Sequence, residues 1–486
     1  MSIDGAMIVA PIPPYRQITK FNYFIAIHLA HSTIAYLPAI AVFRRHFFIQ
    51  REIVPTGRYR YDSTDGFRQS TRHTVLLLCA LARKDGFMEY TLLSVSRRLL
   101  TARTLALMLA ITLPLLAACG RTALPPLGQP SFDAYQQQTE QWVRQHRAFQ
   151  SDDLRQELRW NTPQETRPAD SPRKGILLVH GLGDAPGTFS DVAPELARQG
   201  YLVRTVLLAG HGTRPEDMIP VSLDDWRRVV AEQARLLQRD VDEVYLGGFS
   251  TGANLALEYA LEHPEIRGLA LFSPAIRSNE TFDFLTPLIA PFREWLRTPR
   301  PGAPAQLTTR YLRVPTNGLA QYYLSSLAVR RLLWRHDYDR PVLMVVAEHD
   351  SVLDTPYLRQ LFRTHFTHPA SRLIWYGQPD NAITSREQIR DDRLPDWRIS
   401  QFSHMSVLFS PDNPLYGSNG SVILCNNGPT SVTADQCRDR SRFWYSDWGY
   451  QEEGKTYVRL TFNPYFDWQN GIMREVLAAS DQTQLR

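Results

Sequence analysis

The residues best suited to chemistry lie in a Gly-Phe-Ser-Thr-Gly pentapeptide whose central residue is Ser250. A short apolar run, Val244–Leu246, precedes the pentapeptide, and a segment of helical character begins at Thr251. A chain that turns from strand into helix within about one residue strains its central residue, and flanking glycines avoid the clash of Cβ atoms. Such a turn presents the serine hydroxyl at the positive end of a helix. The pattern predicts that Ser250 is a nucleophile.

A serine hydroxyl is a weak nucleophile until a base takes its proton, and that base needs an acid to fix its tautomer. Where a strand end carries the serine, the acid and then a histidine follow later in the chain. Asp350 lies in the turn directly after an apolar run that ends at Ala347, so we predict that Asp350 is the acid. Asp354 is typical of the N-cap of the following helix, and Asp354 and Glu348 remain lesser candidates.

The predicted base is His404, which lies in the loop Ile399–Ser406 after the last predicted strand. Its position in the chain, after both the serine and the acid, is the one that the chemistry requires. His365 and His368 lie too near the end of a predicted helix, and His336 lies in an insertion. Histidines also serve as buried polar residues, but here chain order and loop position agree.

The negative charge that develops on the substrate oxygen needs two backbone N–H donors. One is predicted to be Thr251, directly after the nucleophile, and the other Leu182, in the loop after an early strand. His180 begins that loop, but it precedes the serine in the chain and is therefore predicted to order the loop. The Gly-His-Gly sequence around His211 is likewise predicted to be a structural turn.

The elements that position these residues follow a repeating pattern. Apolar runs without alternation, separated by helical segments, are typical of a parallel sheet covered on both faces. We therefore predict an α/β fold with a mostly parallel central sheet flanked by helices. The predicted strands are Gly175–Val179, Tyr201–Leu208, Val244–Leu246, Gly268–Phe272, Pro341–Ala347 and Arg372–Tyr376. The predicted helices are Phe132–Ser151, Val192–Gln199, Leu223–Arg239, a helix beginning at Thr251, and Tyr357–Phe366.

Two segments depart from this pattern. Thr162–Lys174 contains several prolines and is predicted to be a loop. Residues 277–340 are rich in Pro, Arg and aromatic residues, with helical character around Gln321–Trp334, and follow the strand after the nucleophile helix. This insertion is predicted to be a lid, although its aromatic residues could equally pack on the core.

Together these features resemble the α/β-hydrolase superfamily, particularly its carboxylesterase and monoacylglycerol-lipase-like branch. The matching motifs are His-Gly-Leu-Gly at His180, Gly-His-Gly at Gly210, the pentapeptide at Gly248, the turn at Asp350, and Ser-His-Met at Ser403. The resemblance covers about residues 175–410. It implies a serine esterase with a Ser-His-Asp triad and a lid, and it requires no metal and no organic cofactor.

The tail, residues 411–486, is not part of the usual fold, although Trp468–Ala479 could be the last core helix reached after a long insertion. Cys425 and Cys437 flank a Gly-, Asn- and Ser-containing loop in this tail. Outside the cytoplasm such a pair most simply forms a disulfide. A zinc site is disfavoured because no Cys-x-x-Cys or matching histidine pair accompanies them.

Basic residues from Arg97 to Arg103, an apolar run from Leu105 to Ala118 and small residues before Cys119 have the layout of a secretory signal. The run is too short to span a bilayer comfortably. Its Leu-Ala-Ala-Cys ending resembles the lipobox of bacterial lipoproteins, which implies lipidation of Cys119. Because Gly120 follows, the expected location is the periplasmic face of the outer membrane in a bacterial envelope.

A signal peptide must lie at the N-terminus, so residues 1–87 are out of place. We hypothesise that translation begins near Met88 and that the upstream residues come from a misplaced start codon. The rival interpretation is a membrane anchor around Phe21–Phe43. The predicted organisation is then a doubtful extension (1–87), a signal peptide (88–118), a tether and N-terminal segment (119–174) and a hydrolase domain (175–486, with the lid at about 277–340 and the C-terminal extension at about 411–486).

The chain has 486 residues and a net charge of +5, but its basic residues are almost all Arg and form no long run. Nucleic-acid binding therefore has little support. The leading hypothesis is a lipid-anchored serine hydrolase that acts on carboxylic esters, of small or lipid-like substrates. An acyltransferase would use the same residues, and a non-catalytic envelope scaffold is the alternative from another class.

Overall fold

The computed structural model describes residues 124–125, 127–298, 302, 304–379, 384–425, 427–428, 437 and 439–479. All of the described residues belong to one compact unit. The predicted extension, the signal peptide and Cys119 lie outside the described residues. Among the helices that are described, none combines the length and the apolar character needed to cross a membrane.

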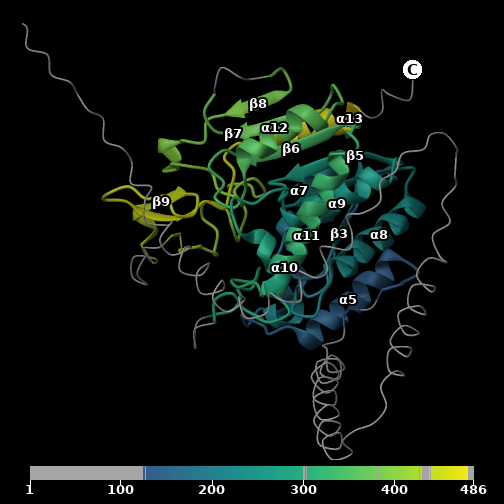
Figure 1. Cartoon of the computed structure of the whole chain (residues 1–486), viewed down its shortest axis with the longest axis horizontal. Helices are drawn as coiled ribbons and strands as arrows, with labels where there is room; N and C mark the ends of the chain where they lie inside the picture. Colours follow the sequence, from purple (N-terminus) through teal and green to yellow (C-terminus); the bar gives the residue numbers. More distant parts are fainter. Residues whose placement is uncertain are drawn as a thin grey trace, which may run out of the picture. The chain divides into compact units, whose positions relative to one another are not determined.

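Within the described residues, the centre of the fold is an eight-stranded sheet with the order β1-β3-β2-β4-β5-β6-β7-β8 (Figure 1). Every neighbouring pair is parallel except β1 with β3. The predicted α/β fold with a mostly parallel sheet is confirmed. The strands are β1 (Glu165–Thr166), β2 (Lys174–Val179), β3 (Tyr201–Val206), β4 (Glu243–Phe249), β5 (Ile266–Phe272), β6 (Val342–Ala347), β7 (Arg372–Tyr376) and β8 (Glu387–Arg390).

Helices cover both faces of this sheet, and two apolar clusters fill the space between them. Alternate residues of each strand point to opposite faces, so Leu177 belongs to one cluster and Ile176 and Leu178 belong to the other. The first cluster joins the sheet to α8, α9, α11 and α12, and the second joins it to α7 and α13. The helices are α5 (Phe132–His146), α6 (Leu154–Trp160), α7 (Val192–Arg198), α8 (Leu223–Asp240), α9 (Thr251–Glu262), α10 (Thr286–Ile289), α11 (Thr316–Leu333), α12 (Thr355–His365) and α13 (Phe466–Ala478).

The register of the parallel strands brings their carboxyl ends to one edge of the sheet. Val179 of β2 pairs with Gly248 of β4, and Phe249 pairs with Phe272 of β5. The loops that follow these strands therefore begin beside one another. In open α/β sheets this edge is where catalytic side chains gather.

Two edge strands were not predicted. β1 lies in the segment predicted to be a loop, and it pairs antiparallel with β3 through Glu165 and Thr166. β8 follows the strand that was predicted to be the last, and it pairs parallel with β7. Both are short and largely polar, and strands at a sheet edge are commonly so. They therefore lack the continuous apolar run that identifies the inner strands.

Two insertions interrupt the sheet-and-helix pattern. The first, residues 277–340, contains η6 (Asp283–Leu285), α10 and α11, and α11 packs against α9. The second, residues 411–465, is called the C-terminal insertion below; its strands β9 (Phe443–Ser446) and β10 (Thr456–Arg459) pair in parallel. After it, α13 returns to pack on β5, β6 and β7, as predicted for the closing helix (Figure 1).

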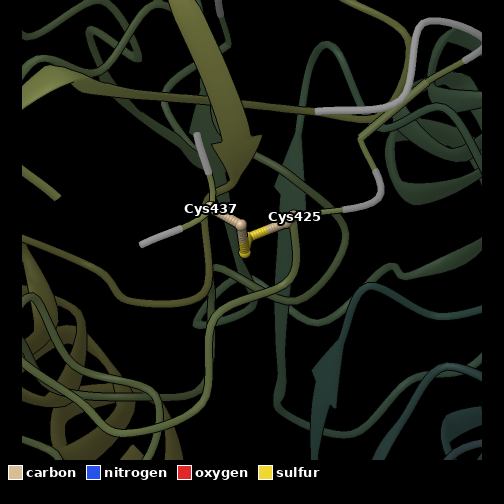
Figure 2. The surroundings of a disulfide bond; sticks show 2 residues. All are labelled: Cys425 and Cys437. Atoms are coloured by element: carbon tan, nitrogen blue, oxygen red, sulfur yellow. A yellow bond between two sulfur atoms is a disulfide. The ribbon is translucent and has the colours of Figure 1, made fainter. Parts of the chain in front are cut away.

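The C-terminal insertion contains the predicted disulfide. Cys425 and Cys437 are bonded, with their Cα atoms 6.0 Å apart (Figure 2). The bond closes a loop within the insertion, and both cysteines precede β9. The prediction of this pairing is confirmed.

Candidate active site

Ser250 lies on the sharp turn between β4 and α9, where the sequence predicted it. Its backbone has φ 55° and ψ −119°, a left-handed φ that is strained for a residue with a side chain. Its N–H donates to the carbonyl oxygen of Phe272 at 3.0 Å, and its carbonyl oxygen accepts from Ala253 and Ala275. These bonds to β5 and α9 hold the residue in a conformation that it would not adopt alone.

The flanking glycines are required by close approach of the backbone. A Cβ on Gly252 would lie 2.0 Å from the carbonyl oxygen of Val179 and 2.4 Å from that of His180. A Cβ on Gly248 would lie 2.4 Å from the carbonyl carbon and oxygen of Gly252. Because no backbone atom can move away at low cost, only glycine allows the first turn of α9 to pack on the end of β2.

His404 and Asp350 form a buried pair. Nδ1 of His404 lies 2.6 Å from Oδ2 of Asp350, and the two side chains are 10% and 0% exposed. The other carboxylate oxygen, Oδ1, accepts the N–H of Val352 at 2.9 Å. With Nδ1 donating to the carboxylate, Nε2 of His404 is left as the acceptor, which is the arrangement a general base needs.

The base also lies beside the nucleophile turn. The ring of His404 contacts the ring of Phe249, the residue before Ser250, with centroids 5.0 Å apart. The hydroxyl of Ser273, at the end of β5, donates to the carbonyl oxygen of His404 at 3.0 Å. The structure thus brings the predicted serine, acid and histidine to one edge of the sheet.

The lesser acid candidates are engaged elsewhere. Oδ1 of Asp354 accepts the N–H of Tyr357 at 3.1 Å and caps α12, as predicted, and its other oxygen forms an ion pair with Arg277. Oε2 of Glu348 accepts the N–H of Gln378 at 2.7 Å. Neither carboxylate contacts a histidine ring, so the geometry favours Asp350.

The loop that carries Leu182 passes against the nucleophile. A Cβ on Gly181 would lie 3.1 Å from the Cβ of Ser250. On the other side of Leu182, the N–H of Gly183 donates to Nε2 of His211 at 3.0 Å, and its carbonyl oxygen accepts from Tyr311 at 2.7 Å. In the described part of the chain, the N–H of Leu182 donates to no acceptor. The loop is therefore fixed in position, and the N–H of Leu182 remains available to a substrate oxygen.

The second predicted oxyanion donor has the same property. Thr251 is the first residue of α9, and helix N-terminal N–H groups have no partner within the helix. Its N–H meets no acceptor among the residues that the structure describes. Two free N–H groups, on the residue after Ser250 and on the loop that passes against it, are what stabilisation of an oxyanion requires.

His180 and His211 order the loops after β2 and β3, as predicted. The ring of His180 is fully buried; its Nδ1 donates to the carbonyl oxygen of Gly181, and its Nε2 accepts the N–H of Leu208 at 3.1 Å. Burial lowers the pKa of His180 well below its usual value, and the neighbouring His211 lowers it further. Burial likewise lowers the pKa of His211 to about 4. Both rings are therefore neutral near pH 7 and act as structural hydrogen-bonding groups.

Several charged residues near the site were not predicted. Asp184 is buried, and burial raises its pKa against the opposing charges of Arg310 and His404. Arg310, in the first insertion, contacts Sδ of Met405, the residue after the base. Asp447, in the C-terminal insertion, accepts the N–H of Ser351 at 2.8 Å. These residues lie outside the motifs, and no local pattern marks them.

The first insertion borders each of the loops at this edge. Tyr311 bonds to the Gly183 loop, and the N–H of Asn279 donates to the carbonyl oxygen of Val352 in the acid turn. Arg310 contacts the loop of the base. The insertion is therefore located where a lid would lie. Within the described residues, no group of three or more His, Cys, Asp or Glu side chains is arranged to hold a metal ion.

A mostly parallel sheet with a serine on a strained strand-to-helix turn, and a histidine–carboxylate pair at the same edge, defines the α/β-hydrolase class. The described part of the chain therefore has the α/β-hydrolase fold. The model of the family described as serine aminopeptidase, S33, matches residues 170–376.

Several curated relatives are monoacylglycerol lipases. A thermostable monoacylglycerol lipase of Bacillus sp. is 34% identical over 108 residues, which are 22% of this chain and 43% of that protein. A monoglyceride lipase of Rattus norvegicus is 30% identical over 117 residues, 23% of this chain and 39% of that protein. The chain thus spans less than half the length of these relatives. A solved structure from two metagenome-derived lipolytic enzymes gives a TM-score of 0.37 at 24% identity, covering 44% of this chain and 86% of that one.

Proposed function

We propose that the protein is a serine hydrolase that cleaves carboxylic esters through a triad of Ser250, His404 and Asp350. The observation that carries the proposal is the 2.6 Å contact between His404 and Asp350 at the sheet edge where Ser250 occupies its strained turn. A buried histidine–carboxylate pair is costly if it serves packing alone. Next to a strained serine turn, it has a clear catalytic use.

In the proposed reaction, Oγ of Ser250 attacks the ester carbonyl while Nε2 of His404 takes the hydroxyl proton. Asp350 holds the Nδ1 proton and stabilises the imidazolium that forms. The N–H groups of Leu182 and Thr251 donate to the oxygen that becomes negative. His404 then gives its proton to the departing alcohol, and water, activated by the same histidine, releases the acid from Ser250.

The proposed substrates are small esters with a lipid-like acyl group. Two observations support this class: the curated relatives are monoacylglycerol lipases, and the first insertion exposes large apolar side chains beside the site. Phe282, Phe284 and Leu288 are each about half exposed or more, and Phe292 is 90% exposed. We propose that this stretch is a lid that meets the acyl chain. An exposed apolar cluster of this kind commonly marks a binding surface.

We also propose that the protein is attached to the bacterial envelope by a lipid on Cys119. The support is the Leu-Ala-Ala-Cys sequence that follows the apolar run. The disulfide between Cys425 and Cys437 agrees with an oxidising compartment. Mass spectrometry of the N-terminal peptide from native material tests this proposal, because a peptide from residues 1–80 would exclude processing at Cys119.

The test of the enzymatic function is hydrolysis of p-nitrophenyl esters over a series of acyl lengths by the wild type, Ser250→Ala and Ser171→Ala. Ser171 is an exposed loop serine and serves as the matched control. We expect Ser250→Ala to lose activity by up to about 10⁶-fold, as when the serine of another triad is removed. Ser171→Ala is expected to match the wild type. Equal rates for Ser250→Ala and the wild type would refute the assignment, and the chain-length profile separates an esterase from a lipase.

A further inference from the structure

The C-terminal insertion is bonded at two places to the segment that leads into the base. Tyr445 of β9 donates its N–H to the carbonyl oxygen of Arg398 at 2.8 Å and accepts the N–H of Ser400 at 2.9 Å. After β10, the carbonyl oxygen of Leu460 accepts the hydroxyl of Ser403 at 2.6 Å. Ser403 precedes His404 in the chain. The insertion therefore holds the segment Arg398–Ser403, directly before the base, through β9 and through the residue that follows β10.

The same insertion also reaches the turn of the acid. Asp447 follows β9 directly and is only 2% exposed. Its Oδ2 accepts the N–H of Ser351, the residue after Asp350, at 2.8 Å. The next N–H, that of Val352, donates to Asp350 itself at 2.9 Å. Two successive amides of the turn are thus held by two carboxylates, one of them supplied by the insertion.

Asp447 is in turn fixed by groups that belong to the insertion. Nδ2 of Asn427, close after Cys425 in the disulfide-closed loop, donates to the carbonyl oxygen of Asp447 at 3.1 Å (Figure 2 shows the disulfide). Oδ1 of Asn427 accepts from Nε of Arg459 at 2.8 Å. Burial lowers the pKa of Arg459 to about 10, while the negative charges of Asp447 and Asp350 oppose this. The half-buried Arg459 guanidinium thus interacts with both carboxylates.

We propose that Asp447 is a positioning residue: by accepting the N–H of Ser351 it holds the acid turn so that Asp350 meets His404. This proposal rests on the proposed function, because it assigns Asp447 a part in the same site. The insertion thereby connects the acid and the base, which lie on separate loops, through one hydrogen-bonded unit.

The physical reason is the cost of a buried donor without a partner. Without the carboxylate of Asp447, the N–H of Ser351 must find another acceptor, and the turn must move to reach one. A shift of about 1 Å in a positioning group costs on the order of 100-fold in rate, because the reacting groups lose alignment. Asparagine at this position keeps an acceptor oxygen of the same reach, whereas alanine and leucine do not.

The test compares Asp447→Ala, Asp447→Asn and Asp447→Leu with Glu453→Gln, which alters an exposed carboxylate of the same insertion. We expect Asp447→Ala to lower kcat by roughly 10- to 100-fold with KM changed less than about threefold. Asp447→Asn is expected to recover most of the loss, and Glu453→Gln to equal the wild type. Asp447→Leu fills the site with an apolar side chain and leaves no cavity, so it decides the question if the alanine variant does not fold.

A second readout is independent of catalysis. The proton shared by His404 Nδ1 and Asp350 gives a far-downfield ¹H NMR resonance, which we expect in the wild type, in Glu453→Gln and in Asp447→Asn. We expect its loss by exchange in Asp447→Ala and Asp447→Leu. If the wild type hydrolyses no ester, this resonance still tests the proposal, so the two failures are distinguishable. An intact resonance in the folded alanine or leucine variant, or an equal loss in Asp447→Asn, would overturn it.

Discussion

At the scale of single residues, Asp350 uses both of its carboxylate oxygens. One receives the proton-bearing nitrogen of His404, and the other receives the N–H of Val352. A fully buried carboxylate is costly unless each oxygen is paired. Here the pairing also fixes which nitrogen of the ring carries the proton. The neighbouring carboxylate of Asp354 caps a helix and offers a matched comparison.

The first residue-scale prediction concerns these two carboxylates. Asp350→Asn is expected to lower kcat for p-nitrophenyl esters by roughly 10⁴-fold, because the amide no longer selects the productive tautomer of His404. Asp354→Asn should keep kcat within about twofold, because Asn also caps helices well. Steady-state kinetics and thermal melting of both variants check this. If Asp354→Asn alone lost activity, the acid would have been misassigned.

Ser250, His404 and Asp350 could be predicted because each lies in a short local pattern and their chain order is constrained by the fold. Asp447 could not be predicted. It lies nearly a hundred residues beyond Asp350 in an insertion of irregular structure, and only the folded chain brings the two together. Sequence patterns identify residues that touch the substrate more readily than residues that support them.

At the scale of elements, the loops after β2 and β3 depend on two buried neutral histidines. His211 accepts the N–H of Gly183, and His180 accepts that of Leu208. Protonation of either ring would turn its acceptor nitrogen into a second donor facing an N–H group. The position of the Leu182 N–H, the proposed oxyanion donor, therefore depends on the protonation state of two histidines outside the proposed triad.

Stability should consequently fall at acid pH. The pKa of His211 is about 4 in the folded protein and about 6.5 when unfolded, so the unfolded state binds more protons between these values. The contribution of His211 is complete above about pH 6.5 and is lost as pH falls toward 4. At pH 5 the loss is about 2 kcal/mol. Urea unfolding at pH 7 and pH 5 measures the free energy of unfolding that is lost on acidification. This loss should be about 2 kcal/mol smaller in His211→Asn than in the wild type. His336→Asn, an exposed control, should lose as much as the wild type.

The inner strands could be predicted from their continuous apolar runs, because both faces of the sheet are buried. β1 and β8 were missed because an edge strand needs only one neighbour and tolerates polar residues. β8 is held by Glu387, which is paired with Arg359 and Arg363. Because ion pairs hold this strand, its sequence shows no hydrophobic periodicity.

At the scale of the whole described domain, one buried ion pair joins its N-terminal helices to the first insertion. Nε of Arg147 lies 2.7 Å from Oε1 of Glu157, with side chains 1% and 0% exposed. The remaining guanidinium nitrogens donate to the carbonyl oxygens of Gly212, Leu307 and Thr308. A single side chain thus holds together three segments far apart in the chain.

Arg147→Met should therefore destabilise the protein by about 3–5 kcal/mol, because it leaves Glu157 charged and buried without its partner. Arg144→Met removes an exposed pair with Glu140 on the same helix and should cost about 0.5 kcal/mol or less. Urea unfolding of both variants measures the difference. Equal stabilities would show that Glu157 is compensated by its bonds to the 150–151 backbone.

The whole-molecule arrangement was predicted only in outline. The positions of both insertions follow from breaks in the apolar pattern, but their contacts do not, because they depend on pairings such as Trp160 with Thr309. Part of the expected lid is fixed by hydrogen bonds. Gln306 and Thr308 bond to residues 147–148, directly after α5, and Thr309 bonds to Tyr416. Any opening is therefore expected in residues 280–298, where the apolar side chains are exposed.

The order of elements along the chain has a consequence for biosynthesis. The strained serine turn is built by β2, β4, α9 and β5, which all end by Phe272, so it can form while much of the chain is still on the ribosome. The base is synthesised later, at residue 404. The insertion residues that bond to its loop follow at 443–460, and α13 then covers the second face of the sheet. On the proposed assignment, a nascent chain therefore carries its nucleophile long before the acid and the base are held in place.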